Sequence, residues 1–442
     1  MRLIQTIKNI FKIEDLRARL IYTFGIILLY RLGKYVTLPG IDPSQLAGLK
    51  SQTSSGLMGL LDMFSGGAFS QASVFALGIM PYISASIVVQ LLGIVFPYFL
   101  KLQKEGESGR RKMNQYTRYL TVGILILQAP TYLVNLHAQL PASAFILTGT
   151  FFTVSSVIIL TAGTMFVMWL GEKITDKGIG NGISLIIMIG IVARLPANFV
   201  FEAGTRMNGA GGAVALIVEI VFLFIVVLGT ILLVQGTRRV PVQYARRIVG
   251  NKQYGGVRQY IPLKVNAAGV MPIIFAQAIM MLPIIIAGYS DSGSGFVVAF
   301  SNMYGFWYNL VTAILIIVFT YFYTAITINP QRLAEDIRKN GGFIPGIKPG
   351  KKTVEYFDNI LSKITLPGSI FLAFVAILPA FAQMGGVDAN FAQFYGGTSL
   401  LILVGVVMDT LQQIESHLLM RHYDGLMKSG KVKGRASTMA SV

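Results

Sequence analysis

The side chains that most often catalyse reactions or bind metals are scarce in this 442-residue sequence. There is no cysteine, so neither a disulfide nor a thiolate metal site can form, and the three histidines are scattered without metal-ligand spacing. Acidic residues inside apolar segments are nearly confined to Asp62, Glu219 and Asp409, whereas a proton- or ion-coupled transporter needs a buried relay of such groups. We interpret Glu219 as an interface-level residue near the outer end of its span.

Glycine-rich stretches do not provide a nucleotide or ion site either. Residues 346–353, GIKPGKKT, resemble a phosphate-binding loop, but the glycine spacing is wrong and no strand is expected before them. Residues 178–182 form a glycine-rich turn, and the sequence TVG at 121–123 lies within an apolar run rather than in a potassium filter. The sequence therefore predicts no enzyme activity, no cofactor and no metal site.

The elements that carry these residues are membrane helices. Charged residues make up only 13% of the sequence, whereas a soluble domain has about a quarter. No cleavage site follows the basic amino terminus, so we expect a retained first helix, with Arg31 and Lys34 reaching an interface at its end. Apolar runs of about 20 residues predict ten spans. These lie near 20–38, 74–99, 119–135, 146–170, 179–200, 213–235, 266–288, 306–328, 366–385 and 398–418.

Residues 64–92 differ from an ordinary membrane helix. They begin with a glycine-rich piece and continue as an apolar run that Gly78 and Pro81 interrupt. The piece before them, 57–64, is too short to cross a bilayer. Half-crossing backbone at membrane depth is stable only inside protein or beside a wet cavity, so we expect this stretch to line a pathway. The alternative is a kinked membrane helix that follows a surface loop.

Lysine and arginine are distributed very unevenly among the connections. The two termini and the loops 100–118, 171–178, 236–265 and 329–365 hold 32 of the 37 basic residues. By the positive-inside rule both termini and these loops face the cytoplasm. Ten spans divide into two halves of five, so the second half is inverted relative to the first, and such repeats place a pathway at their interface. The motif G-x-M-P occurs in span two and again in span seven, which agrees with a repeat.

Two of the basic loops are long. Loops 236–265 and 329–365 each contain seven lysines and arginines, and the first has no acidic residue. Such loops would fix the topology and contact anionic lipid headgroups. Their length also suits a large polyanionic or acidic cytoplasmic partner, such as ribosomal RNA or an acidic protein surface.

Several long stretches together resemble one family, SecY, the channel subunit of the general protein translocase. They recur in order along nearly the whole chain and read LPGID (38–42), MFSGGAFSQASVFALGIMPYISASI (63–87), KEGESGRRKMNQYTRY (104–119), GTMFVMWLGEKITDKGIGNGIS (163–184), LKVNAAGVMPIIFA (263–276), INP (328–330), GGFIPGIKPGKKT (341–353) and FYGGTSLLILVGVVMD (394–409). The resemblance implies an all-α integral membrane protein with ten transmembrane helices. These form two inverted pseudo-repeat halves (helices 1–5 and 6–10), with a short plug half-helix at 57–73 before helix 2.

By motif position, the resemblance also implies roles for individual residues. An apolar pore ring would comprise Ile79, Ile83, Ile187, Ile274 and Ile402. The plug would include Leu60, Leu61, Met63, Phe64, Gly66 and Gly67, whose glycines would let it hinge away. A lateral gate between spans two and three and spans seven and eight would use Ser84, Ser86, Gln90 and Asn266. Docking of a motor or ribosome would use Arg246, Arg247, Lys348, Lys351 and Lys352. Lys348 departs from the arginine that is common in the family, which keeps the charge but loses the bidentate fork.

The function implied is a protein-conducting channel of the inner (cytoplasmic) membrane. It would pass unfolded secretory polypeptides and release hydrophobic segments sideways into lipid. Its partners would be SecE and SecG subunits, the SecA motor ATPase or the ribosome, signal-peptide-bearing or membrane-protein substrates, and anionic lipids. The expected organisation is a cytoplasmic segment (1–19), two halves (20–200 and 201–420) and a basic cytoplasmic tail (421–442). Two alternatives are an inverted-repeat secondary transporter of a small solute and an insertase or scaffold without a through-pore.

Overall fold

The computed structural model of the chain describes residues 13–46, 62–147, 149–208, 212–244, 247–249, 252–254, 258–288 and 304–428. These residues form two compact units. The first contains residues 13–46, 62–190 and 406–428, and the second contains residues 191–405. The boundaries fall inside two helices, α9 (Gly182–Val192) and α18 (Gly397–Lys428).

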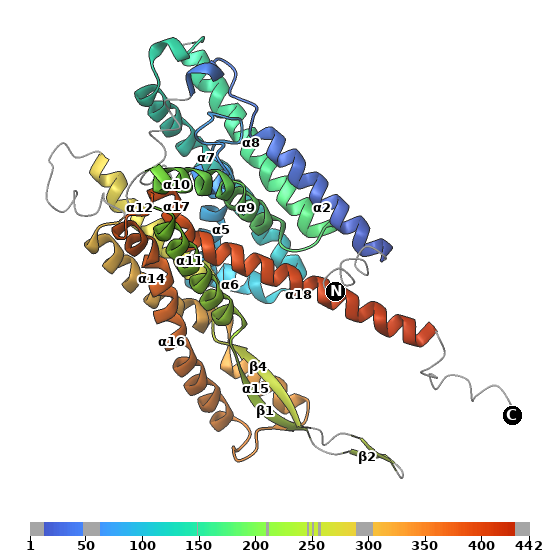
Figure 1. Cartoon of the computed structure of the whole chain (residues 1–442). Helices are drawn as coiled ribbons and strands as arrows, with labels where there is room; N and C mark the ends of the chain where they lie inside the picture. The colour runs from blue at the N-terminus through green and yellow to red at the C-terminus, as the bar shows by residue number, and fades with distance from the viewer. Residues whose placement is uncertain are drawn as a thin grey trace. The chain divides into compact units, whose positions relative to one another are not determined.

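The first unit is a set of packed helices (Figure 1). Its helices are α2 (Glu14–Gly33), α5 (Met80–Val95), α6 (Pro97–Lys104), α7 (Glu107–Gln139), α8 (Thr150–Lys177), most of α9 and the end of α18, with short 3-10 turns η1 (Pro43–Leu46) and η2 (Ala142–Ala144). Helix α7 packs against both α5 and α8. Helix α2 packs against α8. The interior contains mainly aliphatic side chains, with aromatic rings such as Tyr30, Tyr132 and Phe152 packed among them.

The second unit combines helices with a small sheet (Figure 1). Its helices are α10 (Leu195–Asn208), α11 (Gly212–Gln235), α12 (Met271–Gly288), α14 (Phe306–Thr327), α15 (Pro330–Lys339), α16 (Lys351–Met384), α17 (Ala389–Ala392), the 3-10 turn η3 (Gln393–Tyr395) and the start of α18. Helix α14 packs between α12 and α16, and the hairpin of α10 and α11 contacts α16, α17 and η3.

Within the described residues, seven helices are long and apolar enough to cross a membrane, and the broken pair of α5 and α6 raises the number to eight. Helices α2 and α12 occupy the two remaining predicted spans. The break follows from Pro97, which begins α6 and holds Phe96 in an extended conformation, so that the two helices bend by 103°. The fold class predicted from the sequence is thus confirmed.

Several element boundaries differ from those expected. Span two was expected to begin near 74, but residues 74–79 form turns and the helix begins at Met80, with Pro81 in its first turn. Helix α16 begins at Lys351 rather than near 366. Its early part buries Thr353, Phe357, Leu361 and Thr365 at four-residue spacing, so an amphipathic face extends the helix beyond the apolar window.

The basic loop 236–265 contains strands rather than irregular chain. Strands β1 (Thr237–Tyr244) and β4 (Arg258–Lys264) pair antiparallel with Thr237 opposite Lys264, β5 (Gly342–Phe343) joins the other edge of β1, and β2 (Arg247–Val249) pairs with β3 (Lys252–Tyr254). Side chains from β1, β4, α15, α16 and the residue after β5 form one core, made of Val240, Val242, Leu263, Ile337, Ile344, Phe357 and Leu361. We call β1, β4, β5, α15 and the first turns of α16 the loop module.

Candidate functional site

A buried segment, residues 62–79, connects the region after α2 to α5 in the first unit. It is helical only at 62–64 and otherwise consists of turns and bends. Every side chain from 62 to 70 is buried, with Met63 only 2% and Phe64 only 4% exposed. Residues 62–73 of this segment belong to the stretch that the resemblance assigns to the plug (57–73). Leu60 and Leu61 lie outside the described residues.

Polar groups inside the segment satisfy one another. The Asp62 carboxylate accepts a hydrogen bond from the Ser70 amide (2.8 Å), and the Asp62 carbonyl accepts one from the Gly67 amide (2.7 Å). The Ser65 hydroxyl donates to the same carbonyl and accepts from the Phe69 amide. These bonds close a compact loop and satisfy backbone amides that would be costly to bury unpaired.

Three side chains from neighbouring helices donate to carbonyl groups of the segment. The Tyr30 hydroxyl donates to Ser65 (3.2 Å), and the Arg31 guanidinium donates to Gly66 (3.2 Å), both from α2. The Tyr132 hydroxyl, from α7, donates to Phe69 (3.0 Å), and its ring packs edge-on against the Phe69 ring. Arg31 therefore binds the segment, whereas the sequence predicted that it reaches an interface.

Gly66 and Gly67 both have a positive φ, +67° and +87°. A side chain at Gly66 would also meet its surroundings, because a Cβ atom there would lie 2.9 Å from the Gly190 Cα atom. Glycine at 66 is thus required for two reasons: its positive φ, and the close approach of its backbone to that of Gly190.

The predicted ring residues are distributed over both units. In the first unit, Ile79 and Ile187 are buried and Ile83 is half-buried. In the second unit, Ile402 is buried and Ile274 is half-buried. Their convergence into one constriction therefore stays a prediction.

The predicted gate residues are likewise divided. Ser84, Ser86 and Gln90 are half-buried on α5, where the Gln90 amide donates to the Ser86 hydroxyl (3.3 Å). Asn266 lies in the second unit, in the turn before α12, and its Oδ1 atom is buried without a hydrogen-bond partner among the described residues.

Three of the predicted docking residues form one exposed basic patch on the loop module. Lys348, Lys351 and Lys352 are exposed at the turn between β5 and α16, where the Thr353 hydroxyl donates to the Lys348 carbonyl (3.1 Å). Two lysines in the first turn of α16 face the positive end of the helix dipole, which disfavours them by about 0.3–1 kcal/mol. Arg247 lies on β2, and Arg246 lies outside the described residues.

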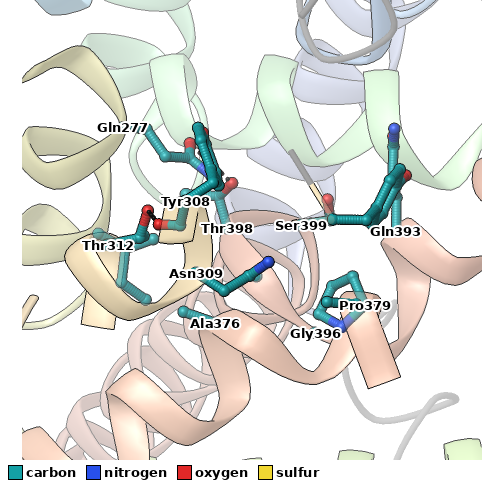
Figure 2. Close-up of a pocket in the computed structure, with 14 residues that line it drawn as sticks. Gln277, Tyr308, Asn309, Thr312, Ala376, Pro379, Gln393, Gly396, Thr398 and Ser399 are labelled. Carbon is teal, nitrogen blue, oxygen red and sulfur yellow. Dashed lines mark hydrogen bonds between the residues drawn. The ribbon is translucent and has the colours of Figure 1, made fainter. Parts of the chain in front are cut away.

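The second unit also contains a small polar cavity of about 60 Å³ between α12, α14, α16 and α18 (Figure 2). The Thr398 hydroxyl donates to the Gln277 side chain across it (3.1 Å), and Tyr308, Asn309 and Thr312 approach from α14. None of the lining residues is charged at neutral pH. The cavity therefore offers no charged ligand for a coupling ion, and it gives no support to the transporter alternative.

Sequence reasoning missed two sets of residues. Tyr30 and Tyr132 looked like ordinary span residues, because their partners lie 35 and 63 positions away along the chain. Glu219 was interpreted as an interface-level residue, yet it is only 8% exposed and pairs with Arg206. An arginine and a glutamate in neighbouring apolar segments were the available signal for this pair.

The helices define a multi-spanning helical membrane protein. The SecY family model matches residues 73–411 of the chain. "Protein translocase subunit SecY" of Corynebacterium glutamicum is 43% identical over 438 residues, covering 95% of this chain and 98% of that protein. "Protein translocase subunit SecY" of Mycobacterium bovis is 45% identical, covering 94% and 97%. The chain belongs to the SecY family of protein-conducting channel subunits.

Solved structures share the fold. The chain resembles "The structure of a protein conducting channel" with a TM-score of 0.60 and 18% identity, covering 90% of this chain and 92% of that one. It also resembles a Sec61 chain from "Sec61 in the Canine ribosome-channel complex from the endoplasmic reticulum", with a TM-score of 0.56, 17% identity and the same coverage.

Proposed function

We propose that the chain passes unfolded secretory polypeptides across the cytoplasmic membrane through a constriction formed by Ile79, Ile83, Ile187, Ile274 and Ile402. The observation that carries this proposal is the buried segment 62–79 of a SecY-family protein, which lies at the position of the predicted plug. Aliphatic side chains would form a compliant seal around a moving chain, and a dry constriction opposes ion leakage. A related SecY protein is described as having a plug domain that "stablizes the closed state of the translocation channel and maintains a membrane seal".

Hydrophobic segments of the substrate would leave sideways through the gate that Ser84, Ser86, Gln90 and Asn266 line. Transfer free energy supports this selectivity, since a charged residue at the bilayer centre costs about 2.5–3.5 kcal/mol whereas a leucine is favoured. Signal peptides and membrane segments would therefore enter the lipid, and polar segments would continue through the pore.

The basic patch of Lys348, Lys351 and Lys352 would dock the partner that drives the polypeptide. All three lysines are exposed, and the helix dipole disfavours the two on α16, Lys351 and Lys352, which supports a role in binding rather than in folding. SecA and the ribosome are the proposed occupants, and two similar structures come from ribosome complexes. We further propose SecE and SecG as companion subunits, and contacts of the basic loops with anionic lipids.

The orientation follows from the distribution of basic residues. Both termini and the loop module would face the cytoplasm, because the positive-inside rule places 32 of the 37 basic residues there.

Reconstituted vesicles test this function. Vesicles that contain the full-length chain with its companion subunits should protect an unfolded secretory precursor from protease when SecA and ATP are supplied. Replacing Lys348, Lys351 and Lys352 by glutamine should reduce this uptake several-fold, whereas Lys339→Gln, which removes another exposed lysine of the same module, should leave it unchanged. Uptake of small solutes without any protection of the precursor would contradict the proposal.

A further inference from the structure

Three charged side chains meet in the interior of the second unit, where α10 lies against α11. Arg206 Nε donates to Glu202 Oε1 (3.0 Å), one turn earlier on α10. Arg206 Nη2 also lies 2.5 Å from Glu219 Oε1 on α11. The side chains of Glu202, Arg206 and Glu219 are only 1%, 11% and 10% exposed, and we call them the buried triad.

The two carboxylates differ in their remaining partners. Glu202 Oε2 accepts a hydrogen bond from the Asp388 amide (3.0 Å), so both of its oxygens are satisfied. Glu219 Oε2 is buried and has no hydrogen-bond partner in the described part of the chain, and neither has the hydroxyl of Tyr395, which is 1% exposed. Burial and the two carboxylates raise the pKa of the Tyr395 phenol, which therefore stays neutral beside them.

The triad has one negative charge more than positive charge when both carboxylates are ionised. Apart from Arg206, helices α10, α11 and α17 and the turn η3 contain no lysine, arginine or histidine in their described residues. The membrane part of α16, residues 366–384, has no ionisable side chain. The Asp388 carboxylate instead accepts from the Asn390 amide, and the Tyr304 hydroxyl donates to the Ala389 carbonyl. An uncompensated charge with this degree of burial is unfavourable by several kcal/mol.

We propose that Glu202 and Glu219 hold one proton between them at neutral pH, so that the buried triad is a proton-binding site of the second unit. The proton resides mainly on Glu219 Oε2, because that oxygen accepts no hydrogen bond while both oxygens of Glu202 do. A metal cation fits less well. The site offers two carboxylates, both already in contact with a guanidinium that repels cations, and no group of three acidic or histidine ligands occurs among the described residues.

The proton has a structural consequence. The triad links the α10–α11 hairpin to the 386–395 segment that immediately precedes α18, through Glu202 and the Asp388 amide. Loss of the proton leaves a buried negative charge at this link. The stability that the neutral triad contributes is therefore complete at acidic pH and is lost as the pH rises and the proton dissociates.

The test uses the full-length chain in lipid nanodiscs. Infrared spectra of the wild type at neutral pH should contain the carbonyl stretching band of a protonated carboxyl in a dry environment. Glu219→Gln should remove this band, because it replaces the protonated acid with a neutral group of the same shape. The midpoint of thermal unfolding should fall for the wild type from mildly acidic to alkaline pH and fall less for Glu219→Gln. Glu335→Gln, at an exposed glutamate of α15, should leave both the band and the wild-type pH dependence intact.

Two results would overturn the proposal. The first is a wild-type spectrum without a protonated carboxyl band at neutral pH, which requires no variant to fold. The second is a stability that depends on the sodium or calcium concentration instead of the pH, since a metal cation would then neutralise the triad.

Discussion

At the scale of single residues, the buried segment 62–79 is retained by donors that reach its carbonyl groups from α2 and α7. Tyr30, Arg31 and Tyr132 each donate to a buried carbonyl of the segment, and the Ser65 and Phe69 carbonyls also accept from the Ala68 and Ala72 amides. Backbone hydrogen bonds from Leu38 to Ala72 and from Val74 to Val36 also join the segment to the chain after α2, and none of these contacts belongs to a named helix or strand. The three side-chain donors are therefore the places where a substitution should loosen a plug.

Tyr132→Phe removes one donor and keeps the ring that packs on Phe69. The Phe69 carbonyl keeps the Ala72 amide as a donor, so the variant loses one hydrogen bond, which is worth about 0.5–1.5 kcal/mol, and the closed arrangement should weaken by a similar amount. We expect faster leakage of a trapped ion from vesicles that contain the variant. Tyr119→Phe on the same helix is the control, because Tyr119 is 72% exposed. Equal leakage from the wild type and Tyr132→Phe would show that this bond does not retain the segment.

Gly66→Ala should disturb the segment by another route. Its Cβ atom would lie 2.9 Å from the Gly190 Cα atom, and its φ of +67° already strains any other residue. Gly106 is the matched control, since its φ is +73° but a Cβ atom there meets nothing within 4 Å. We expect Gly66→Ala to lower the unfolding temperature and increase leakage clearly more than Gly106→Ala does. Similar effects of the two variants would mean that close packing against Gly190 is unimportant.

The sequence predicted an unusual glycine-rich segment before α5 but not its partners, and the hinge role of its glycines stays a prediction. Glycine types and an apolar run are local signals, whereas Tyr30 and Tyr132 are joined to the segment only by the packing of helices distant in the sequence. The buried triad was missed for the same reason, since the contact between Arg206 and Glu219 depends on how α10 packs against α11.

At the scale of elements, the loop module is a folded unit with its own core rather than a flexible basic loop. Strands β1 and β4 contain Pro241 and Pro262, which weaken a strand prediction. Long-range packing against α15 and α16 compensates, because Val240, Val242 and Leu263 are buried there. This compensation could not be predicted from strand propensity, whereas the apolar windows of the membrane helices predicted their number and order well.

Phe357→Ala tests whether this core holds the module together. Phe357 is 0% exposed and contacts the sheet side of the core from α16, so its truncation should cost about 3–5 kcal/mol locally. We expect protease to cleave between 237 and 264 more rapidly, while the membrane helices remain intact. Phe343→Ala on β5 removes a partly exposed ring (39%) and should have little effect. Unchanged cleavage in Phe357→Ala would contradict the idea of a cooperative module.

At the scale of the whole molecule, the central proposal is a passive channel whose substrate passes Ile83. The multi-spanning helical fold and the family were predictable from apolar runs and long motifs, whereas the orientation derived from the basic residues stays a prediction. The isoleucine ring stays a prediction that rests on the family resemblance alone, because a lone isoleucine in an apolar helix is indistinguishable from ordinary packing.

The most direct measurement uses the absence of native cysteine. One cysteine replaces Ile83, and another is placed at successive positions of a secretory polypeptide stalled during passage through the full translocase. We expect a disulfide whose yield depends on the stall position. We expect no disulfide for Val88→Cys, a position on the same helix that is 40% exposed. If a stalled complex forms but no substrate position links to residue 83, the polypeptide does not pass this part of α5 and the central claim is wrong.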